Sequence, residues 1–243
     1  MENESKSSRN KRVEFGQHHL VDTRIILLLV QSIAPQLNED ILELGSGKGI
    51  VTRLVSLCSR TVHSYEVDRE LFDCARLHCI DRPNVRLYNS DPLKLSLPKF
   101  DIFVSNIPYS ISRQVMTWLC YQSFLRGIIM LQEELSSKIF SQPGEKDYTA
   151  ISVISQYCLT MEILTKVPPQ AFTPQPLVSS VLIRIKRKQN TLDLTEIRKI
   201  QLLFSKGKSH SKHAERRQGS DNLKIRKIRT LLPDEIVELA RTA

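Results

Sequence analysis

Short apolar runs alternate with helical runs along residues 41–140, and this alternation limits the folds that the chain can adopt. The apolar runs are rich in Val, Ile, Leu, Phe and Tyr, which is typical of buried strands. The predicted strands are residues 41–44, 61–67, 85–88, 100–105 and 127–131. The predicted helices are residues 22–36, 50–57, 69–79, 113–121 and 133–140. Such alternation forms a mostly parallel sheet with helices on both faces, so we expect a Rossmann-like α/β domain.

The last third of the chain has a different pattern. Two further strands, residues 161–167 and 180–186, flank a Pro-rich loop and are expected to be antiparallel. After Lys188 only helices are predicted, at residues 194–204, 223–232 and 233–240, with Pro233 suited to a first helical position. The predicted domains are an N-terminal arm (1–14), an α/β domain (15–188) and a small helical domain (189–243).

Composition excludes several classes of protein. A hydrophobic content of 41% is enough for a sizeable core. The longest aliphatic run, residues 25–30, is too short to span a bilayer, and the polar first 14 residues do not resemble a secretory signal. The five cysteines contain no C-x-x-C pair. We therefore expect a monomeric cytoplasmic protein with reduced thiols, no membrane partner and no metal.

The positive charge of the chain is concentrated near its C-terminus. Residues 184–229 hold 15 Lys and Arg against 4 Asp and Glu, whereas the remainder holds 20 against 22. A solvated helical face is one explanation. An excess of this size in so short a segment favours a polyanion partner, and nucleic acid is the commonest one.

Asn106-Ile107-Pro108-Tyr109 follows the predicted strand 100–105. The exocyclic amino group of a nucleobase is a weak nucleophile, because its lone pair is delocalised into the ring. The side-chain oxygen of Asn106 and the carbonyl of the residue before or at Pro108 can accept its two hydrogens and localise that lone pair. Tyr109 can stack on the base. Asn106, Pro108 and Tyr109 are therefore the predicted catalytic residues, although a plain strand-end turn would use the same residue types.

Three other strand ends supply groups for a cofactor. Gly45 and Gly47 lie in a G-x-G-x-G turn after strand 41–44, where the backbone can pass close to a ligand. The spacing matches neither a dinucleotide fingerprint nor a P-loop. Glu66 can accept both hydroxyls of a ribose, and Asp91 can accept from an adenine amino group. These groups describe an adenosine ligand without phosphates, and S-adenosylmethionine fits that description.

With these motifs in order, the chain resembles the KsgA-type ribosomal RNA adenine dimethyltransferases. The resemblance covers residues 16–186 and rests on Gly16-Gln17-His18, Glu43–Gly49, Glu66-Val67-Asp68, Asp91–Lys94, Asn106–Ser112, Gln132-Glu133-Glu134, Pro143–Tyr148 and Val167–Pro176. It implies that His18 and Leu20 also contact S-adenosylmethionine and that Phe172 sandwiches the target adenine with Tyr109. Lys206 and Lys208 lie in the basic C-terminal segment, which matches the family only loosely, and they are predicted to bind RNA because of their charge. The implied substrate is two adjacent adenosines in the hairpin loop near the 3′ end of small-subunit ribosomal RNA, each dimethylated.

The sequence departs from the family at several positions. His19 stands where the family usually has Phe, and Leu177 and Ser179 replace a usual Lys and Asp. Two other functions stay open. An Erm-type methyltransferase of large-subunit RNA shares the Asn-Ile-Pro-Tyr motif, and an assembly or transcription factor could keep the fold and RNA binding without catalysis. The segments 143–148 and 168–176 favour the first reading over Erm, and the intact motifs argue against a non-catalytic factor.

Overall fold

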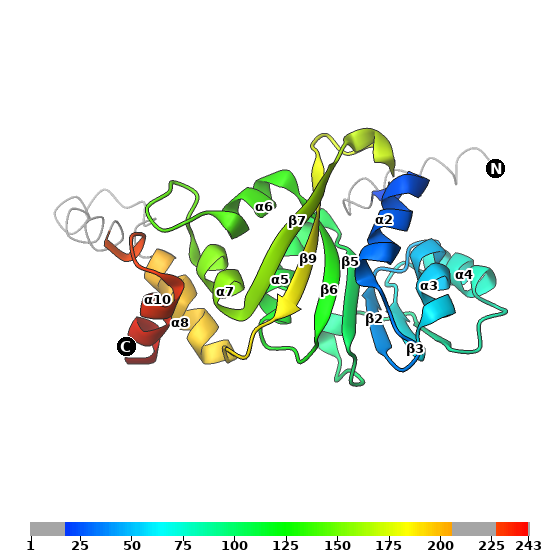
Figure 1. The fold of residues 1–243 in the computed structure, drawn as a ribbon, viewed down its shortest axis with the longest axis horizontal. Coiled ribbons are helices and arrows are strands. Elements are labelled where there is room, and N and C mark those ends of the chain that lie inside the picture. The colour runs from blue at the N-terminus through cyan, green and yellow to red at the C-terminus, as the bar shows by residue number, and fades with distance from the viewer. Residues whose placement is uncertain (1–17, 206–226, 243) are drawn as a thin grey trace. The chain divides into compact units, whose positions relative to one another are not determined.

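The computed structural model describes residues 18–205 and 227–242, and Figure 1 shows their fold. The chain divides into two compact units. The sheet unit contains the described residues up to Val115, together with Ser123–Glu133 and Met161–Arg187. The helical unit contains Met116–Gln122, Glu134–Thr160 and the described residues from Lys188 onward. The polypeptide therefore passes between the units several times, and the helical unit takes segments from within the predicted domain 15–188.

Seven strands form the main sheet in the order β4-β3-β2-β5-β6-β9-β7. Their bounds are β2 Asp40–Leu44, β3 Thr61–Tyr65, β4 Val85–Tyr88, β5 Ile102–Asn106, β6 Arg126–Gln132, β7 Leu159–Val167 and β9 Ser180–Arg187. Strands β4 to β6 are parallel to their neighbours, and β9 is antiparallel to β6. The expected mostly parallel α/β sheet is confirmed.

One face of the sheet is covered by helices α2 (Thr23–Ile33) and α3 (Ile50–Val55), as Figure 1 shows. Alternate strand residues point to this face, among them Ile41, Val62 and Ile102, and all three are fully buried. They form one apolar cluster with residues of α2 and α3. Burial of this cluster fixes the strand register, because a slip by one residue would turn every apolar side chain to the other face.

Both ends of α2 are stabilised by side chains. Asp22 caps the first turn by accepting a hydrogen bond from the Arg24 backbone N–H at 2.9 Å. At the other end the Arg126 guanidinium donates to the carbonyls of Ile33 (3.1 Å) and Ala34 (2.9 Å) and pairs with the nearly buried Glu39. These bonds fix α2 on the sheet and explain why it ends earlier than the predicted residue 36.

Two further predicted helices are present with shifted ends, namely α4 Arg69–His78 and α5 Ser112–Leu119. Helix α6, Glu133–Phe140, has its predicted bounds, and α5 and α6 continue into the helical unit. Short 3-10 turns occur at Ser56–Cys58, Pro92–Lys94, Tyr109–Ile111 and Pro169–Ala171. The sequence did not predict the small antiparallel pair of β1 (His19–Leu20) and β8 (Phe172–Thr173). This pair joins residues near the N-terminus to the Pro-rich loop.

The helical unit contains α7 (Ala150–Cys158), α8 (Leu194–Ser205) and α10 (Pro233–Thr242), which pack against one another. Helices α8 and α10 match their predictions. The predicted helix 223–232 is described only from residue 227 onward, where the chain is helical to residue 228 and then forms a turn. Helix α7 was not predicted. Nearly all of its residues are buried, so it lacks the polar face that reveals a helix in a sequence. Tyr148 is also buried and donates its hydroxyl to the Leu231 carbonyl at 3.0 Å.

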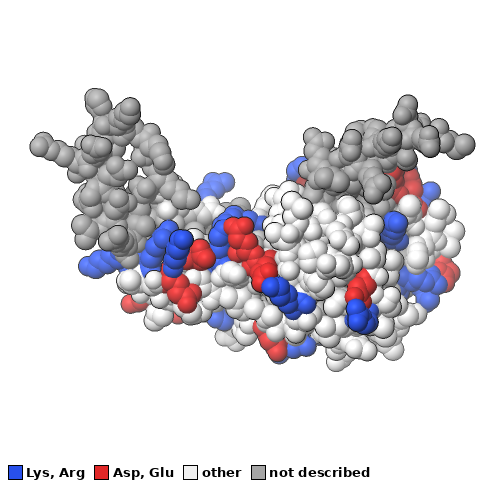
Figure 2. All heavy atoms as spheres, turned by 90° about the horizontal axis from the view of Figure 1, so that it is seen from above, with Lys and Arg blue, Asp and Glu red and all other residues white. Residues whose placement is uncertain are grey.

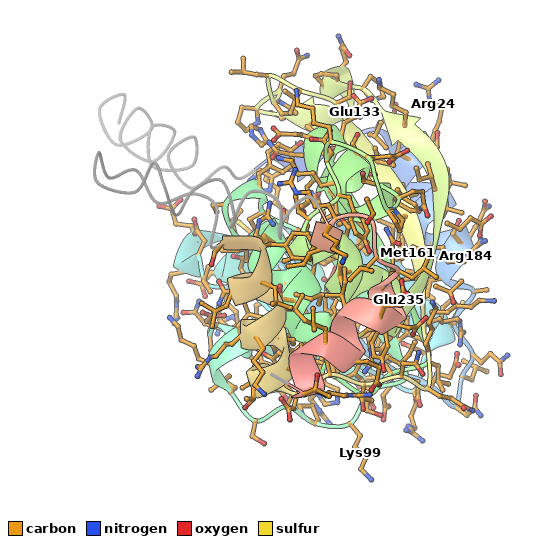
Figure 3. The ribbon with its side chains drawn as sticks, turned by 90° about the vertical axis from the view of Figure 1, so that its left-hand side faces the viewer. Arg24, Lys99, Glu133, Met161, Arg184 and Glu235 are labelled. Carbon is orange, nitrogen blue, oxygen red and sulfur yellow. The ribbon has the colours of Figure 1, made fainter. Side chains whose placement is uncertain are left out.

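Charged side chains of both signs are interspersed over the described surface that Figure 2 shows. Arg24 and Lys99 are exposed and point outward in Figure 3. Many of the basic side chains have acidic partners, such as Arg184, whose guanidinium donates to Glu162 at 2.6 Å. Within the described residues, no helix is both long enough and apolar enough to cross a membrane. Of the net charge of +11 noted in residues 184–229, +5 falls on residues 206–226, outside the described ranges, and the rest falls on described residues.

Candidate functional site

A cavity of about 590 Å³ lies in the sheet unit at the carboxyl ends of β2, β3 and β5. This is the edge at which parallel α/β sheets bind ligands, and the volume is in the usual range for small-molecule sites. The predicted site residues that line the cavity are His18, Leu20, Gly45, Gly47, Glu66, Asp91, Asn106, Pro108 and Tyr109. The fold therefore brings together residues that are up to 91 positions apart in the sequence.

The glycine turn between β2 and α3 forms the floor of the cavity. Gly47 has φ 54° and Gly49 has φ 82°, values that favour glycine. At Gly49 an added Cβ would lie 3.0 Å from the Ala75 Cα of helix α4, so a side chain would push the two elements apart. Ser46, in the same turn, has a buried hydroxyl without a hydrogen-bond partner among the described residues, and a bound ligand can supply one.

Glu66 lies directly after β3 and is only 6% exposed. One of its carboxylate oxygens accepts from the Gly47 backbone N–H at 2.9 Å, and the other accepts from the Asp68 N–H at 3.0 Å. Burial raises the pKa of Glu66, although these bonds act in the opposite direction. Each oxygen keeps a lone pair, so the two can accept the two hydroxyls of a ribose.

Asp91 begins the turn after β4. Its Oδ1 accepts from the Leu93 N–H at 3.0 Å, and its Oδ2 lies 3.3 Å from the Lys94 ammonium. The carboxylate is fixed at the cavity wall and keeps the capacity to accept from an amino group. Together with Glu66 and the glycine turn, it fits an adenosine ligand.

The Asn106 side chain has a defined orientation at the end of β5. Its Nδ2 donates to the His18 carbonyl at 2.9 Å, which leaves Oδ1 as the atom available to accept. The Pro108 carbonyl already accepts from the Ile111 N–H and the Ser112 hydroxyl, both at 3.1 Å. Of the two carbonyls considered from the sequence, that of Ile107 is therefore the better acceptor for an amino group.

Tyr109 is held at the mouth of the cavity by its hydroxyl, which lies 2.7 Å from the Ser180 hydroxyl. Burial raises the pKa of Tyr109, so the phenol stays neutral. The His18 ring lies 5.1 Å from the Tyr109 ring, centroid to centroid, and its Nδ1–H donates to the Pro174 carbonyl at 2.8 Å. Ser180 was not singled out in the sequence, because a serine at a strand start carries no distinctive signal.

Phe172, which the resemblance placed against the target adenine, is buried instead. Its side chain is 1% exposed and belongs to the apolar cluster under α2 and α3. The β1–β8 pairing draws this residue inward, because Leu20 and Phe172 are register partners and both belong to that cluster. A buried ring cannot stack on a base in this conformation. Lys206 and Lys208 lie outside the described residues.

Glu43 is a cavity residue to which the sequence analysis gave no role. It is 2% exposed on β2, and its Oε2 accepts from the hydroxyls of Thr52 (2.5 Å) and Ser64 (2.6 Å). Burial raises the pKa of Glu43 to about 7. The signal was visible as one charged residue within the apolar strand Ile-Leu-Glu-Leu. No three His, Cys, Asp or Glu side chains of the described residues are arranged to hold a metal.

Comparisons with known proteins place the chain in a family. The family described as ribosomal RNA adenine dimethylase matches residues 8–220. A ribosomal RNA small subunit methyltransferase A from Thermotoga petrophila is 34% identical over 193 residues, 79% of this chain and 74% of the relative. A probable enzyme of the same name from Pyrobaculum aerophilum is 32% identical over 231 residues, 94% of this chain and 97% of the relative.

Two solved structures share the fold. A dimethyladenosine transferase from Plasmodium falciparum is 22% identical with a TM-score of 0.71, covering 81% of this chain and 74% of that one. The 23S rRNA methyltransferase ErmE is 26% identical with a TM-score of 0.62, covering 77% and 78%. The chain therefore belongs to the ribosomal RNA adenine dimethylase family, whose methyl donor is S-adenosylmethionine.

Proposed function

We propose that this protein dimethylates the N6 atoms of two adjacent adenosines in the 3′-terminal hairpin loop of small-subunit ribosomal RNA, during ribosome assembly. The observation that carries the proposal is the fixed Asn106 amide, whose free Oδ1 lies in a cavity fitted for an adenosine ligand. The small-subunit substrate is supported by the family and by relatives named for that subunit. The monomeric state, the cytoplasmic location and RNA binding by residues 189–243 are parts of the same proposal.

S-adenosylmethionine, when bound, supplies an electrophilic methyl group. The residues that would hold it are Glu66 and Asp91 with the Gly45–Gly49 turn. Asn106 Oδ1 and the Ile107 carbonyl accept the two N6 hydrogens of the adenine, which localises the nitrogen lone pair. These acceptors act mostly by orientation, and positioning alone can supply several kcal/mol, roughly 7–11 in well-aligned reactions. No strong base is needed, because the methylated ammonium product is acidic and loses its proton to water.

The target base has to leave its stack before it can reach Asn106. Unstacking costs least in a loop or a single strand, which agrees with a hairpin-loop substrate. Tyr109 offers an aromatic face for the extruded base at the cavity mouth. With Phe172 buried, this ring is the stacking partner that remains among the two predicted.

A second candidate is methylation of large-subunit RNA. It is favoured by the similarity to ErmE, which extends over 77% of this chain. Against it stands the higher identity to relatives named for the small subunit, 34% and 32%.

One experiment separates these functions. Purified small and large ribosomal subunits that lack adenine methylation are incubated with the protein and labelled S-adenosylmethionine, and the modified nucleotides are mapped. We expect label in the small subunit alone, at two neighbouring adenosines, and none with the Asn106→Ala variant. Label confined to the large subunit would establish the second candidate. Binding of either subunit without transfer of label would favour a non-catalytic factor.

A further inference from the structure

A buried carboxyl group without a basic partner forms part of the cavity wall. Glu43 is 2% exposed and lines the cavity from the carboxyl half of β2. It accepts hydrogen bonds from two neutral hydroxyls, those of Thr52 and Ser64, and both reach the same oxygen, Oε2. Within the described ranges, no Lys, Arg or His side chain forms an ion pair with it. A buried charge is costly without compensation, so this carboxyl needs either a proton or a nearby cation.

In the part of the chain that the structure describes, no cation is among the groups that shift the pKa of Glu43. Glu66, from β3, raises its pKa further by repulsion. Cys79, beyond α4, also faces it, and burial raises the pKa of that thiol to about 11, so the thiol stays neutral. The other titratable side chains that line the cavity are His18, His19, Lys48, Tyr65, Asp91 and Tyr109. Lys48 is exposed to solvent, and Asp91 lies near Lys94.

The methyl donor of the family has a property that matches this site. S-adenosylmethionine carries a positive charge on sulfur, and the product that remains after methyl transfer is a neutral thioether. The two ligands are otherwise nearly identical in shape, so shape alone separates them poorly. The two ligands differ in the charge on sulfur, and a carboxylate without its own counter-ion attracts the positively charged one more strongly.

We propose that Glu43 discriminates between the cationic methyl donor and its neutral product, and that it releases a proton to solvent when the donor binds. The inference rests on the proposed function, because it takes the donor as the ligand of the cavity. Glu43 acts here as a positioning residue and not as a base in the transfer. Below neutral pH the group is protonated and the preference for the donor is weak. Above it the carboxylate is charged, the donor is favoured and the product leaves more easily.

The expected effect is measurable. Two unit charges on the order of 10 Å apart, in a site of intermediate polarity, interact strongly enough to change affinity by roughly tenfold. The ratio of product to donor dissociation constants should therefore rise about tenfold between pH 5.5 and pH 8.5 in the wild-type protein. Glu43→Gln keeps the shape and the hydrogen-bonding capacity but cannot ionise, so its ratio should stay constant over this range.

Calorimetric titration of the RNA-free protein with S-adenosylmethionine and with S-adenosylhomocysteine at the two pH values tests this directly. Titration near pH 6.5 in buffers of different ionisation enthalpy measures the proton released on donor binding. The donor's own amino group titrates as well, and subtraction of the Glu43→Gln result removes that contribution. Glu66→Gln is the comparison variant, since it alters the other buried carboxyl of the same cavity: it should weaken both ligands and move the pH dependence of the ratio to lower pH without abolishing it.

The outcomes distinguish a failure of the role proposed for Glu43 from a failure of the proposed function. A wild-type ratio that is independent of pH, or a Glu43→Gln protein that keeps the wild-type pH dependence, overturns the role of Glu43 while donor binding itself stands. Failure of the wild-type protein to bind either ligand contradicts the proposed function instead. If Glu43→Gln does not fold, the pH dependence and the proton release of the wild-type protein still decide the question.

Discussion

The Asn106 amide donates to the backbone carbonyl of His18 at 2.9 Å, and this bond joins two segments 88 residues apart. It fixes the orientation of the amide, because a flipped amide would place two oxygens against each other. The free Oδ1 is therefore the acceptor that remains for a substrate amino group. The backbone of His18, directly before β1, thus positions the predicted catalytic amide.

Asn106→Ala should lower the single-turnover rate of methyl transfer by roughly 10²–10³-fold, the range for removing one oriented group that stabilises a transition state. RNA affinity should change little, because the acceptor matters most as the nitrogen becomes tetrahedral. Asn84→Ala is the matched control: Asn84 donates to the Ser56 and Ser59 carbonyls within the same unit and does not line the cavity. It should reduce stability alone. Loss of RNA binding with a normal rate per bound complex would make Asn106 a docking residue.

Two variants separate the contribution of the Tyr109 ring from that of its hydroxyl. Tyr109→Ala should weaken productive RNA binding by about 1–3 kcal/mol, the range for stacking of a base on an aromatic ring. Tyr109→Phe keeps the ring but loses the bond to Ser180, so most activity should remain. Steady-state kinetics with Tyr121→Ala as a control at a half-exposed tyrosine provide the measurement. Equal losses in the Phe and Ala variants would show that the hydroxyl, and not stacking, is what matters.

Glu66→Ala should weaken S-adenosylmethionine by roughly 1.5–3 kcal/mol, the range for hydrogen bonds to a charged group. Calorimetry on the folded variant provides the measurement. Glu162→Ala is a suitable control, since Glu162 is exposed on edge strand β7 and pairs with Arg184. If the folded Glu66→Ala variant binds S-adenosylmethionine with wild-type affinity, Glu66 does not bind the ribose.

Glu43 should also make the stability of the ligand-free protein depend on pH. Its pKa rises from 4.5 to about 7 on folding, so the folded state holds the proton more tightly than the unfolded state. The contribution is complete below pH 4.5 and is lost as the pH rises through 7, a change of about 3 kcal/mol in the free energy of unfolding. Urea unfolding at pH 5 and pH 8 measures it. Glu43→Gln should flatten this dependence; the same slope in both proteins would assign it to other groups, Glu66 first.

Much of the fold and of the cavity could be predicted, because both depend on local signals. The ends of Ile102–Asn106 and of its parallel neighbours converge at one edge of the sheet, so polar residues that follow successive strands could be assigned to one site. Gly45, Glu66 and Asp91 were found in this way. Glu43 could have been found too, as a charge inside an apolar strand.

The remaining features depend on contacts that have no local signal. Phe172 follows prolines, which suggested an exposed loop, but the distant β1 segment pairs with it and buries it. Helix α7 is buried on nearly every side, and its sequence has no charged residue to mark a solvent face. The choice between the Ile107 and Pro108 carbonyls depends on hydrogen bonds that Ile111 and Ser112 donate to Pro108. The sequence alone does not show these bonds.

The basic residues near the C-terminus should bind RNA phosphates. Such binding releases counterions, so affinity should fall steeply with salt. Five residues outside the described ranges are to be reversed to Glu together, namely Lys206, Lys208, Lys212, Arg216 and Arg217. The variant should bind small-subunit RNA more weakly, and the slope of log affinity against log salt should flatten by about 0.7 for each lost contact with single-stranded RNA.

A charge-matched control separates the effect of where the basic residues lie from the effect of the net charge of the protein. Five exposed basic residues of the sheet unit are reversed in the same way, namely Arg69, Arg76, Arg86, Lys99 and Lys166. We expect this control to keep a steeper slope than the C-terminal variant, because net charge alone makes no defined phosphate contacts. Donor affinity should be unchanged in the C-terminal variant, since none of the cavity-lining residues is altered. Equal slopes in the two variants would show that the C-terminal charges form a solvated surface, and RNA docking would then have to be sought elsewhere.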